Sequence, residues 1–291
     1  MGKAMRSEKK SRIRRGEPIE ALGLTFYPIK MSQYEEFLDC RDAWCTRLST
    51  LPMPYYSMSF LSALWALDVD SFERNGKPIG LFQRVIRLLC LSLRLEYSAE
   101  LFREMVYIGE SGRELHHLKL QQGGSAVEVT PREFANHIRP LVAQQNGLKL
   151  PDESDNPDIV QAEEMMARDA LKKSKLDYDT DTLIASVAYL SGVQERELEE
   201  WTVLQFEKRA EAIERDKRFM LYGQAELSGM VKFPKGNPFP SWRYDSKQQS
   251  AALIDINEVE QKHRGIGSVK QAIASATSAS SPQTPNFEKG E

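Results

Sequence analysis

The sequence predicts an α+β protein that is predominantly α, with a small β meander in its N-terminal half, a helical C-terminal half and disordered ends. Three observations support this prediction. Apolar residues recur at helical spacing over much of the chain, as in Tyr56–Leu67 and Gly80–Leu95. Alternating residues between Val106 and Thr130 indicate short strands joined by glycine-containing turns. From about Gly265 the chain is rich in Ser, Ala and Thr with few apolar residues, which is typical of disorder.

The composition is that of a folded chain with a substantial core. Of the 291 residues, 41% are hydrophobic and 28% are charged, which suits about two domains of ordinary size. The net charge of -3 and the pI of 6.0 argue against a general nucleic-acid binder, because phosphate binding goes with net basicity. The longest apolar runs, Phe60–Leu67 and Leu88–Leu93, are too short to cross a bilayer.

The cysteines indicate the compartment in which the chain works. Cys40, Cys45 and Cys90 form an odd, sparse set that fits a reducing compartment better than a disulfide framework. No Cys or His cluster completes a metal site in the sequence, so we interpret these residues as structural, buried thiols. We therefore expect a cytoplasmic protein with no membrane partner, no metal and no cofactor.

Composition divides the chain into four segments. Residues 3 to 15 hold many basic side chains against one acid, Glu8, and such a block predicts a flexible arm. Pro151–Pro157 is an acidic, turn-rich break and marks the expected domain boundary. The predicted segments are a basic flexible arm (1–17), an α+β N-terminal domain (18–150), a helical C-terminal domain with a Pro/aromatic docking segment (151–245) and a mostly disordered tail (246–291).

Local signals mark the starts of several elements. Ala21–Ile29 has strand-like residues and is predicted to be extended. Ser32 followed by Glu35 has the pattern of a capping box and predicts a helix start. Thr130 followed by Glu133, with proline at the first helical position, is a second and stronger start signal.

Candidate catalytic groups are few. His116 and His117 are adjacent on a predicted strand, so their side chains point to opposite faces and do not easily share one ligand set. His137 lies in no metal-binding spacing, and Ser111 is not part of a nucleophile elbow. We therefore predict that the chain is not an enzyme. An enzyme built on the histidine strand stays as an alternative, and it predicts stoichiometric metal in the purified protein.

The stretch Phe233–Tyr244 interleaves aromatic residues with prolines. Prolines that flank aromatics are typical of an extended protein-docking segment, whereas basic residues among aromatics would suit base stacking. Because few basic residues lie nearby, we favour protein docking. Trp201 and Phe206 are added as binding candidates, with a place in their own domain's core as an equal alternative. The predicted protein-binding residues are Trp201, Phe206, Phe233, Phe239, Trp242 and Tyr244.

Three stretches of the chain carry a resemblance to a known family. They are Phe26–Met31 followed by a Tyr/Phe helix, Thr130–Asn146 with Phe134, Ile138-Arg139 and Gln145-Asn146, and Ser191–Tyr244 with Ser191-Gly192-Val193, Gln205-Phe206, Gly229, Lys232 and Trp242. In the order of its elements the chain resembles tail-assembly chaperones encoded by the siphophage- or myophage-type tail modules of phages and prophages of Gram-positive bacteria.

The resemblance implies a non-enzymatic role in the host cytoplasm. Such proteins bind the long helical tape-measure protein, help tail-tube subunits polymerise around it, and are absent from the finished particle. Self-association is compatible with this role. Two alternatives stay open, namely a nucleic-acid-associated phage protein that uses the basic arm and a permanent structural part of the virion.

Overall fold

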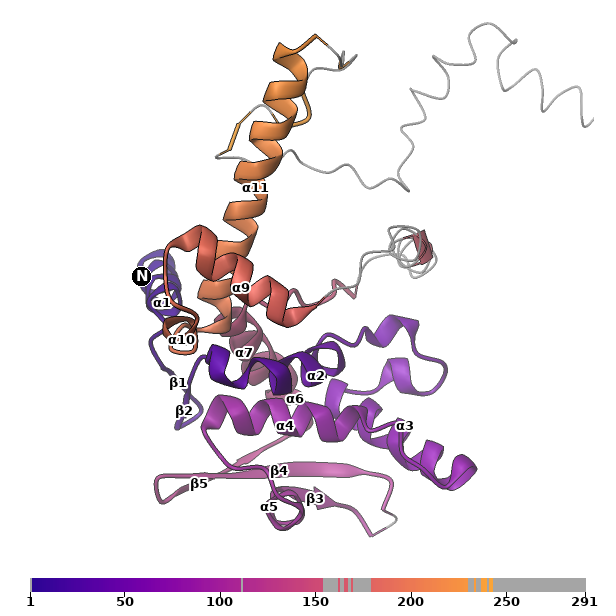
Figure 1. Cartoon of the computed structure of the whole chain (residues 1–291). Coiled ribbons are helices and arrows are strands. Elements are labelled where there is room, and N and C mark those ends of the chain that lie inside the picture. The colour runs from indigo at the N-terminus through magenta and orange to yellow at the C-terminus, as the bar shows by residue number, and fades with distance from the viewer. Residues whose placement is uncertain are drawn as a thin grey trace, which may run out of the picture.

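The computed structural model describes residues 2–110, 112–153 and 179–229, together with positions 162, 165, 166, 169, 233, 237–239, 241 and 242. Within these residues the chain is predominantly helical with two small antiparallel sheets, which confirms the predicted fold class (Figure 1). None of the described helices is long and apolar enough to cross a membrane. The predicted tail, 246–291, lies outside the described residues.

The described elements follow one another along the chain in the order of their numbers. The α-helices are α1 (Gly2–Arg15), α2 (Tyr34–Trp44), α3 (Phe60–Asn75), α4 (Leu81–Leu93), α5 (Ala99–Met105), α6 (Pro131–Glu133), α7 (Arg139–Asn146), α9 (Thr180–Ser191), α10 (Glu195–Leu198) and α11 (Val203–Leu227). Short 3-10 turns are η1 (Met31–Gln33), η2 (Leu48–Thr50) and η3 (Tyr55–Ser57), and η4 (Phe134–Ile138) is a π-helical turn. The strands are β1 (Ile19–Ala21), β2 (Leu24–Phe26), β3 (Val106–Ile108), β4 (Leu115–Gln122) and β5 (Ser125–Val129).

The sheets confirm the predicted meander and correct the first predicted strand. β3, β4 and β5 pair antiparallel in chain order. The segment 21–29, predicted as one strand, instead takes part in a β1–β2 hairpin whose register pairs Ala21 with Leu24. The chain reverses at Leu22 and Gly23, which both have positive φ (53° and 74°). Such a turn matches the right-handed twist of the flanking strands.

Helix α4 lies at the centre of the hydrophobic core. It packs against α2 and α3, and in Figure 1 it lies between α2 and the three-stranded sheet. Phe82, Ile86 and Leu89, which stand at helical spacing in the stretch Gly80–Leu95, are at most 1% exposed. Leu88 and Leu91 are buried as well. A helix that is apolar on most of its surface must be covered on several sides, and α4 has such cover.

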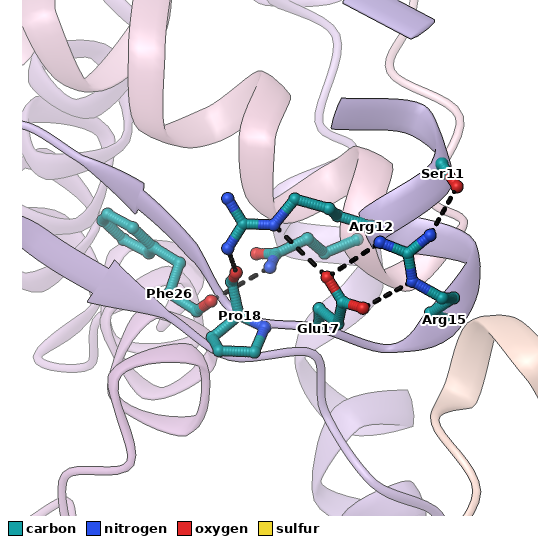
Figure 2. A network of polar contacts seen from close by, with 7 residues as sticks. Ser11, Arg12, Arg15, Glu17, Pro18 and Phe26 are labelled. Atoms are coloured by element: carbon teal, nitrogen blue, oxygen red, sulfur yellow. Dashed lines mark hydrogen bonds and ion pairs between the residues drawn. The ribbon is translucent and has the colours of Figure 1, made fainter. Parts of the chain in front are cut away.

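The predicted flexible arm is wrong for its described part, because residues 2–15 form the helix α1. This helix packs against α7 and β1, and Ile13 is buried with 8% exposure. Figure 2 shows the polar network that fixes its end, in which Arg12 and Arg15 both pair with Glu17. Arg12 Nη2 also donates to the Pro18 carbonyl at 2.7 Å. Glu17, two residues past the helix, thus neutralises part of the repulsion among the basic side chains of α1. That repulsion is the reason why the sequence predicts a flexible arm.

The two predicted capping boxes have opposite outcomes. At α6 the Thr130 side chain and the Glu133 backbone N–H form the expected box. At Ser32 the prediction is wrong, because η1 precedes α2 and Gln33 occupies the N-cap without a side-chain bond. The Ser32 backbone N–H instead donates to the Glu199 carbonyl at 3.3 Å. Partners far along the chain therefore set the start of α2.

The core includes residues from both sides of the predicted boundary near residue 150. Leu198, Val203 and Phe206 belong to the same hydrophobic cluster as Phe26 and Ile29. An isolated antiparallel bridge between Lys30 and Thr202 joins the two parts. The segments predicted as two domains therefore share buried surface at the base of α11.

Candidate protein-binding surface

Helix α11 begins at a firmly held position. Thr202 caps it through a box in which Thr202 Oγ1 accepts from the Gln205 backbone N–H at 3.2 Å and Gln205 Oε1 accepts from the Thr202 N–H at 3.0 Å. The Val203 N–H donates to the Ile29 carbonyl at 2.9 Å. From this base α11 extends away from the sheets and α4, as Figure 1 shows. Isolated helices are marginal in water, so the part of α11 beyond the core depends on contacts of its own.

An apolar stripe follows α11 from the core toward solvent. Its members stand at intervals of seven residues and are Phe206, Ile213, Met220 and Leu227. Ile213 is partly buried against the core, and the exposed fraction rises from 0% at Phe206 to 52% at Met220 and 90% at Leu227. Leu221, beside the stripe, is 64% exposed. The side chains that fix the helix base therefore continue outward as an uncovered apolar surface.

Ion pairs on the polar surface support the projecting helix. Lys208 Nζ lies 2.6 Å from Glu211 Oε2, one helical turn away. Arg218 pairs with Glu214 in the same way. Exposed pairs of this kind contribute about 0.2–0.5 kcal/mol each to an isolated helix. They help to keep α11 helical, but they do not cover the apolar stripe.

The other side of α11 near its C-terminal end holds an aromatic cluster. The ring centroid of Tyr222 lies 5.6 Å from that of Phe233 and 4.8 Å from that of Phe239. The Arg218 guanidinium lies 5.7 Å from the Phe239 ring centroid. Two of the predicted binding residues are thus partly engaged with their own helix, and they shape the surface around its end.

The remaining predicted binding residues differ in accessibility. Phe206 is fully buried, and its ring lies 5.6 Å from that of Tyr34. A partner cannot reach Phe206 in this structure. Of the two predicted roles, binding residue and core residue, the structure shows the core position for Phe206. Trp201 is partly buried against the same core, with Arg209 5.9 Å from its ring centroid. Trp242 is 54% exposed, and Tyr244 lies outside the described residues.

The three histidines that the structure describes, His116, His117 and His137, do not converge on one site. His117 stacks on Tyr107 with 4.6 Å between ring centroids, and its Nε2 lies 4.0 Å from the Glu128 carboxylate. His116 and His137 are exposed. Within the described ranges, no group of three His, Cys, Asp or Glu side chains is placed to hold a metal ion. The structure offers a structural role for His117 in the sheet.

The cysteines are placed in or beside the core. All three are free thiols, and Cys40 and Cys90 are buried. Burial raises the pKa of Cys40 to about 11 and that of Cys90 to about 12. Burial also raises the pKa of Cys45. Because the thiolate is the reactive species, these residues are poor nucleophiles at neutral pH.

A second surface feature was not predicted from the sequence. An apolar pocket of about 490 Å³ opens between α3, α4 and α5, with aromatic walls from Trp65, Phe72, Phe82, Tyr97 and Phe102. Asp68 at its edge is 7% exposed and binds backbone N–H groups of the α4 N-terminus. The signal in the sequence is an acidic residue between Leu67 and Val69 of α3, but only the fold shows that it caps another helix.

The three stretches that carry the family resemblance meet around Ile29. Gln145 Nε2 donates to the Phe26 carbonyl at 3.0 Å, and Asn146 Oδ1 accepts from the Ile29 N–H. The Met31 N–H donates to the Trp201 carbonyl at 2.9 Å. These residues therefore hold the base of α11 in place. Comparisons of the chain with protein-family models, curated proteins and solved structures gave no match.

Proposed function

We propose that this chain is a non-enzymatic protein-binding factor that holds an elongated helical client along the outer half of α11. The observation that carries the proposal is the heptad-spaced apolar stripe, which is buried at Phe206 and exposed at Met220 and Leu227. Large exposed apolar residues on one side of a helix mark interaction surfaces more often than scattered ones do.

The spacing indicates the shape of the client. A row that repeats every seven residues faces one side of a helix and matches the repeat of a second helix lying alongside it. Burying a side chain such as Met220 or Leu227 contributes at most about 1.5–3 kcal/mol. Two such residues, together with Leu221, suit a client that is bound and later released. Methionine also adapts to irregular partners.

More specifically, we propose that the client is the tape-measure protein of a phage tail. The chain would bind it in the host cytoplasm, together with tail-tube subunits. It is supported by the resemblance of the three stretches to tail-assembly chaperones. A tape-measure protein is long and helical, which is the client shape that α11 suits. Phe233, Phe239 and Trp242 would then border the client at the end of α11.

The test is binding of the purified full chain to the tape-measure protein of the phage or prophage that encodes it. We expect the double variant Met220→Glu/Leu227→Glu to weaken binding strongly, because charges would replace the exposed apolar contacts. The matched control is Met53→Glu, which alters a side chain that is 70% exposed on another part of the surface. Equal binding by the wild type and the double variant would contradict the proposed surface.

A second measurement separates the chaperone from the structural virion protein. Purified mature particles are analysed for the chain by mass spectrometry. A chaperone is absent from particles in which tape-measure and tube proteins are present. A stoichiometric amount of the chain in those particles would overturn the chaperone proposal and favour the structural one.

A further inference from the structure

A basic groove lies at the base of α11, where α1, α7 and α11 meet. It has a volume of about 710 Å³. Its α1 side is basic and its floor is apolar. The residues that matter for its chemistry are Lys9, Lys10, Arg14 and Lys208 on the rim and Ile13 and Leu204 on the floor.

The basic residues of α1 divide into two groups. Arg12 and Arg15 pair with Glu17 at the end of the helix (Figure 2). Lys9, Lys10 and Arg14 are exposed and line the groove, and among the described residues no carboxylate forms an ion pair with them. Three cations therefore face the groove without a neutralising partner, which makes it electropositive in a chain of net charge -3.

The floor of the groove is apolar, in contrast to its basic rim. Ile13 is 8% exposed, and Leu204 is partly buried against the core. None of the residues that line this groove is aromatic. A nucleic-acid backbone would find cations here but no ring on which a base can stack. It would also leave the apolar floor uncovered.

We propose that this groove binds an acidic amphipathic helix of a partner protein. The carboxylates of such a helix would pair with Lys9, Lys10 and Arg14, and its apolar side would cover Ile13 and Leu204. Docking of an amphipathic helix into a groove between helices is a recurrent mode of recognition. Complementary charge then fixes its orientation and speeds its association.

This site is separate from the client surface of the proposed function. Leu204 lies near the start of α11, and Met220 lies about 24 Å further along the helix axis, given a rise of about 1.5 Å per residue. The inference therefore goes beyond the proposed function and can be tested without the tape-measure protein.

The experiment measures fluorescence anisotropy of a labelled peptide on titration with the full chain. The probe is an amphipathic peptide of about three heptads with leucine at the apolar positions and glutamate elsewhere. We expect the triple variant Lys9→Gln/Lys10→Gln/Arg14→Gln to weaken binding about tenfold, and salt to weaken binding to the wild type. These side chains are exposed, so the variant should fold, which circular dichroism checks.

A matched triple variant controls for the loss of charge alone. Lys77→Gln/Arg103→Gln/Arg132→Gln removes three exposed cations that do not line this groove, and it should bind the probe as the wild type does. The Met220→Glu/Leu227→Glu variant should also keep probe binding. That result separates failure of the groove from failure of the client surface.

Three outcomes would overturn the inference. One is equal affinity for a peptide in which glutamine replaces every glutamate, because the cations would then play no part. Another is tighter binding of a single-stranded DNA of about 20 nucleotides, lost in the α1 triple variant, which would assign the groove to nucleic acid. Absence of any binding to the acidic probe would equally contradict the proposal.

Discussion

Gly16, directly after α1, packs against Thr202, the residue that caps α11. A Cβ atom added at Gly16 would lie 2.9 Å from Thr202 Cγ2. Gly16 has a φ of 73° and its N–H donates to the Ile13 carbonyl at 3.0 Å, so it ends α1 in a left-handed conformation. The basic helix and the long helix are therefore joined at a point where only glycine fits without movement.

Replacing Gly16 with alanine should loosen α1 from the base of α11. The left-handed conformation costs a non-glycine residue about 1–2 kcal/mol, and overpacking against Thr202 should add about 1 kcal/mol or more. Urea unfolding measures the loss of stability, and amide hydrogen exchange of residues 8–15 shows whether α1 is released.

The control for this change is Gly76→Ala. Gly76 has a similar φ of 69°, but nothing lies within 4 Å of its added Cβ. It should show the cost of the backbone conformation without the clash. Equal losses of stability in the two variants would mean that Thr202 accommodates the extra methyl group.

Asn146 should be needed for the junction around Ile29. Its Oδ1 accepts from the Ile29 N–H at 2.8 Å, and its Nδ2 donates to the Val142 carbonyl at 2.9 Å. Asn146→Ala would leave a buried backbone N–H without an acceptor, which costs about 1–3 kcal/mol. Urea unfolding should show this loss, whereas the exposed Asn75→Ala should change stability by less than about 0.5 kcal/mol.

Local patterns predicted those parts of the fold that depend on local contacts. The Thr130 capping box needs only Glu133, three residues away, and the meander needs only alternation and turns. Ser32 and α1 were predicted incorrectly because their partners are remote or tertiary. The Ser32 N–H bonds to Glu199, and α1 is held by packing on α7 as well as by Glu17. A local pattern contains no information about such partners.

The candidate surface could be predicted only in part for the same reason. The sequence shows that Phe206 and Met220 share one side of a helix, but burial depends on where α11 leaves the core. Phe206 lies on the part of α11 that is packed in the core, and Met220 lies on the part that projects from it. Residue type alone favours aromatic side chains as binding candidates, whereas the exposed residues at heptad spacing on α11, Met220 and Leu227, are aliphatic.

Phe206→Ala should destabilise the chain rather than remove a contact to a partner. Phe206 is 0% exposed and packs in the core, so truncation should cost about 3–5 kcal/mol. Trp242, at 54% exposure, should cost less than about 1 kcal/mol when replaced by alanine. Thermal and urea unfolding of the two variants provide the comparison. Similar losses in both would place Trp242 in a packed environment as well.

Asp68 should make stability depend on pH through its contact with another helix. Its Oδ1 accepts from the N–H groups of Gly80 and Leu81, at 2.8 and 3.3 Å, and its Oδ2 accepts from that of Phe82 at 3.0 Å. Gly80 cannot cap α4 with a side chain, so Asp68 on α3 supplies the cap. Burial raises the pKa of Asp68 above 3.8, and the three backbone donors offset this effect only in part.

A raised pKa in the folded state fixes the sign of the pH dependence. Below pH 3.8 the Asp68 carboxyl is protonated in both the folded and the unfolded chain. The stability that its raised pKa gives to the folded chain is then present in full. As pH rises, the unfolded chain ionises more readily than the folded one, so this contribution falls until the pH exceeds the folded pKa. The variant Asp68→Asn keeps the size of the side chain and has no proton to lose.

We therefore expect Asp68→Asn to gain stability relative to the wild type as the pH is raised from about 3 to about 7. Urea unfolding at several pH values measures the difference, in which the titration of all other groups cancels. Asp216→Asn, an exposed carboxylate of α11, controls for the loss of one negative charge. If the profiles of the wild type and Asp68→Asn run parallel, the three backbone donors balance the cost of burial and Asp68 is ionised as easily as in the unfolded chain.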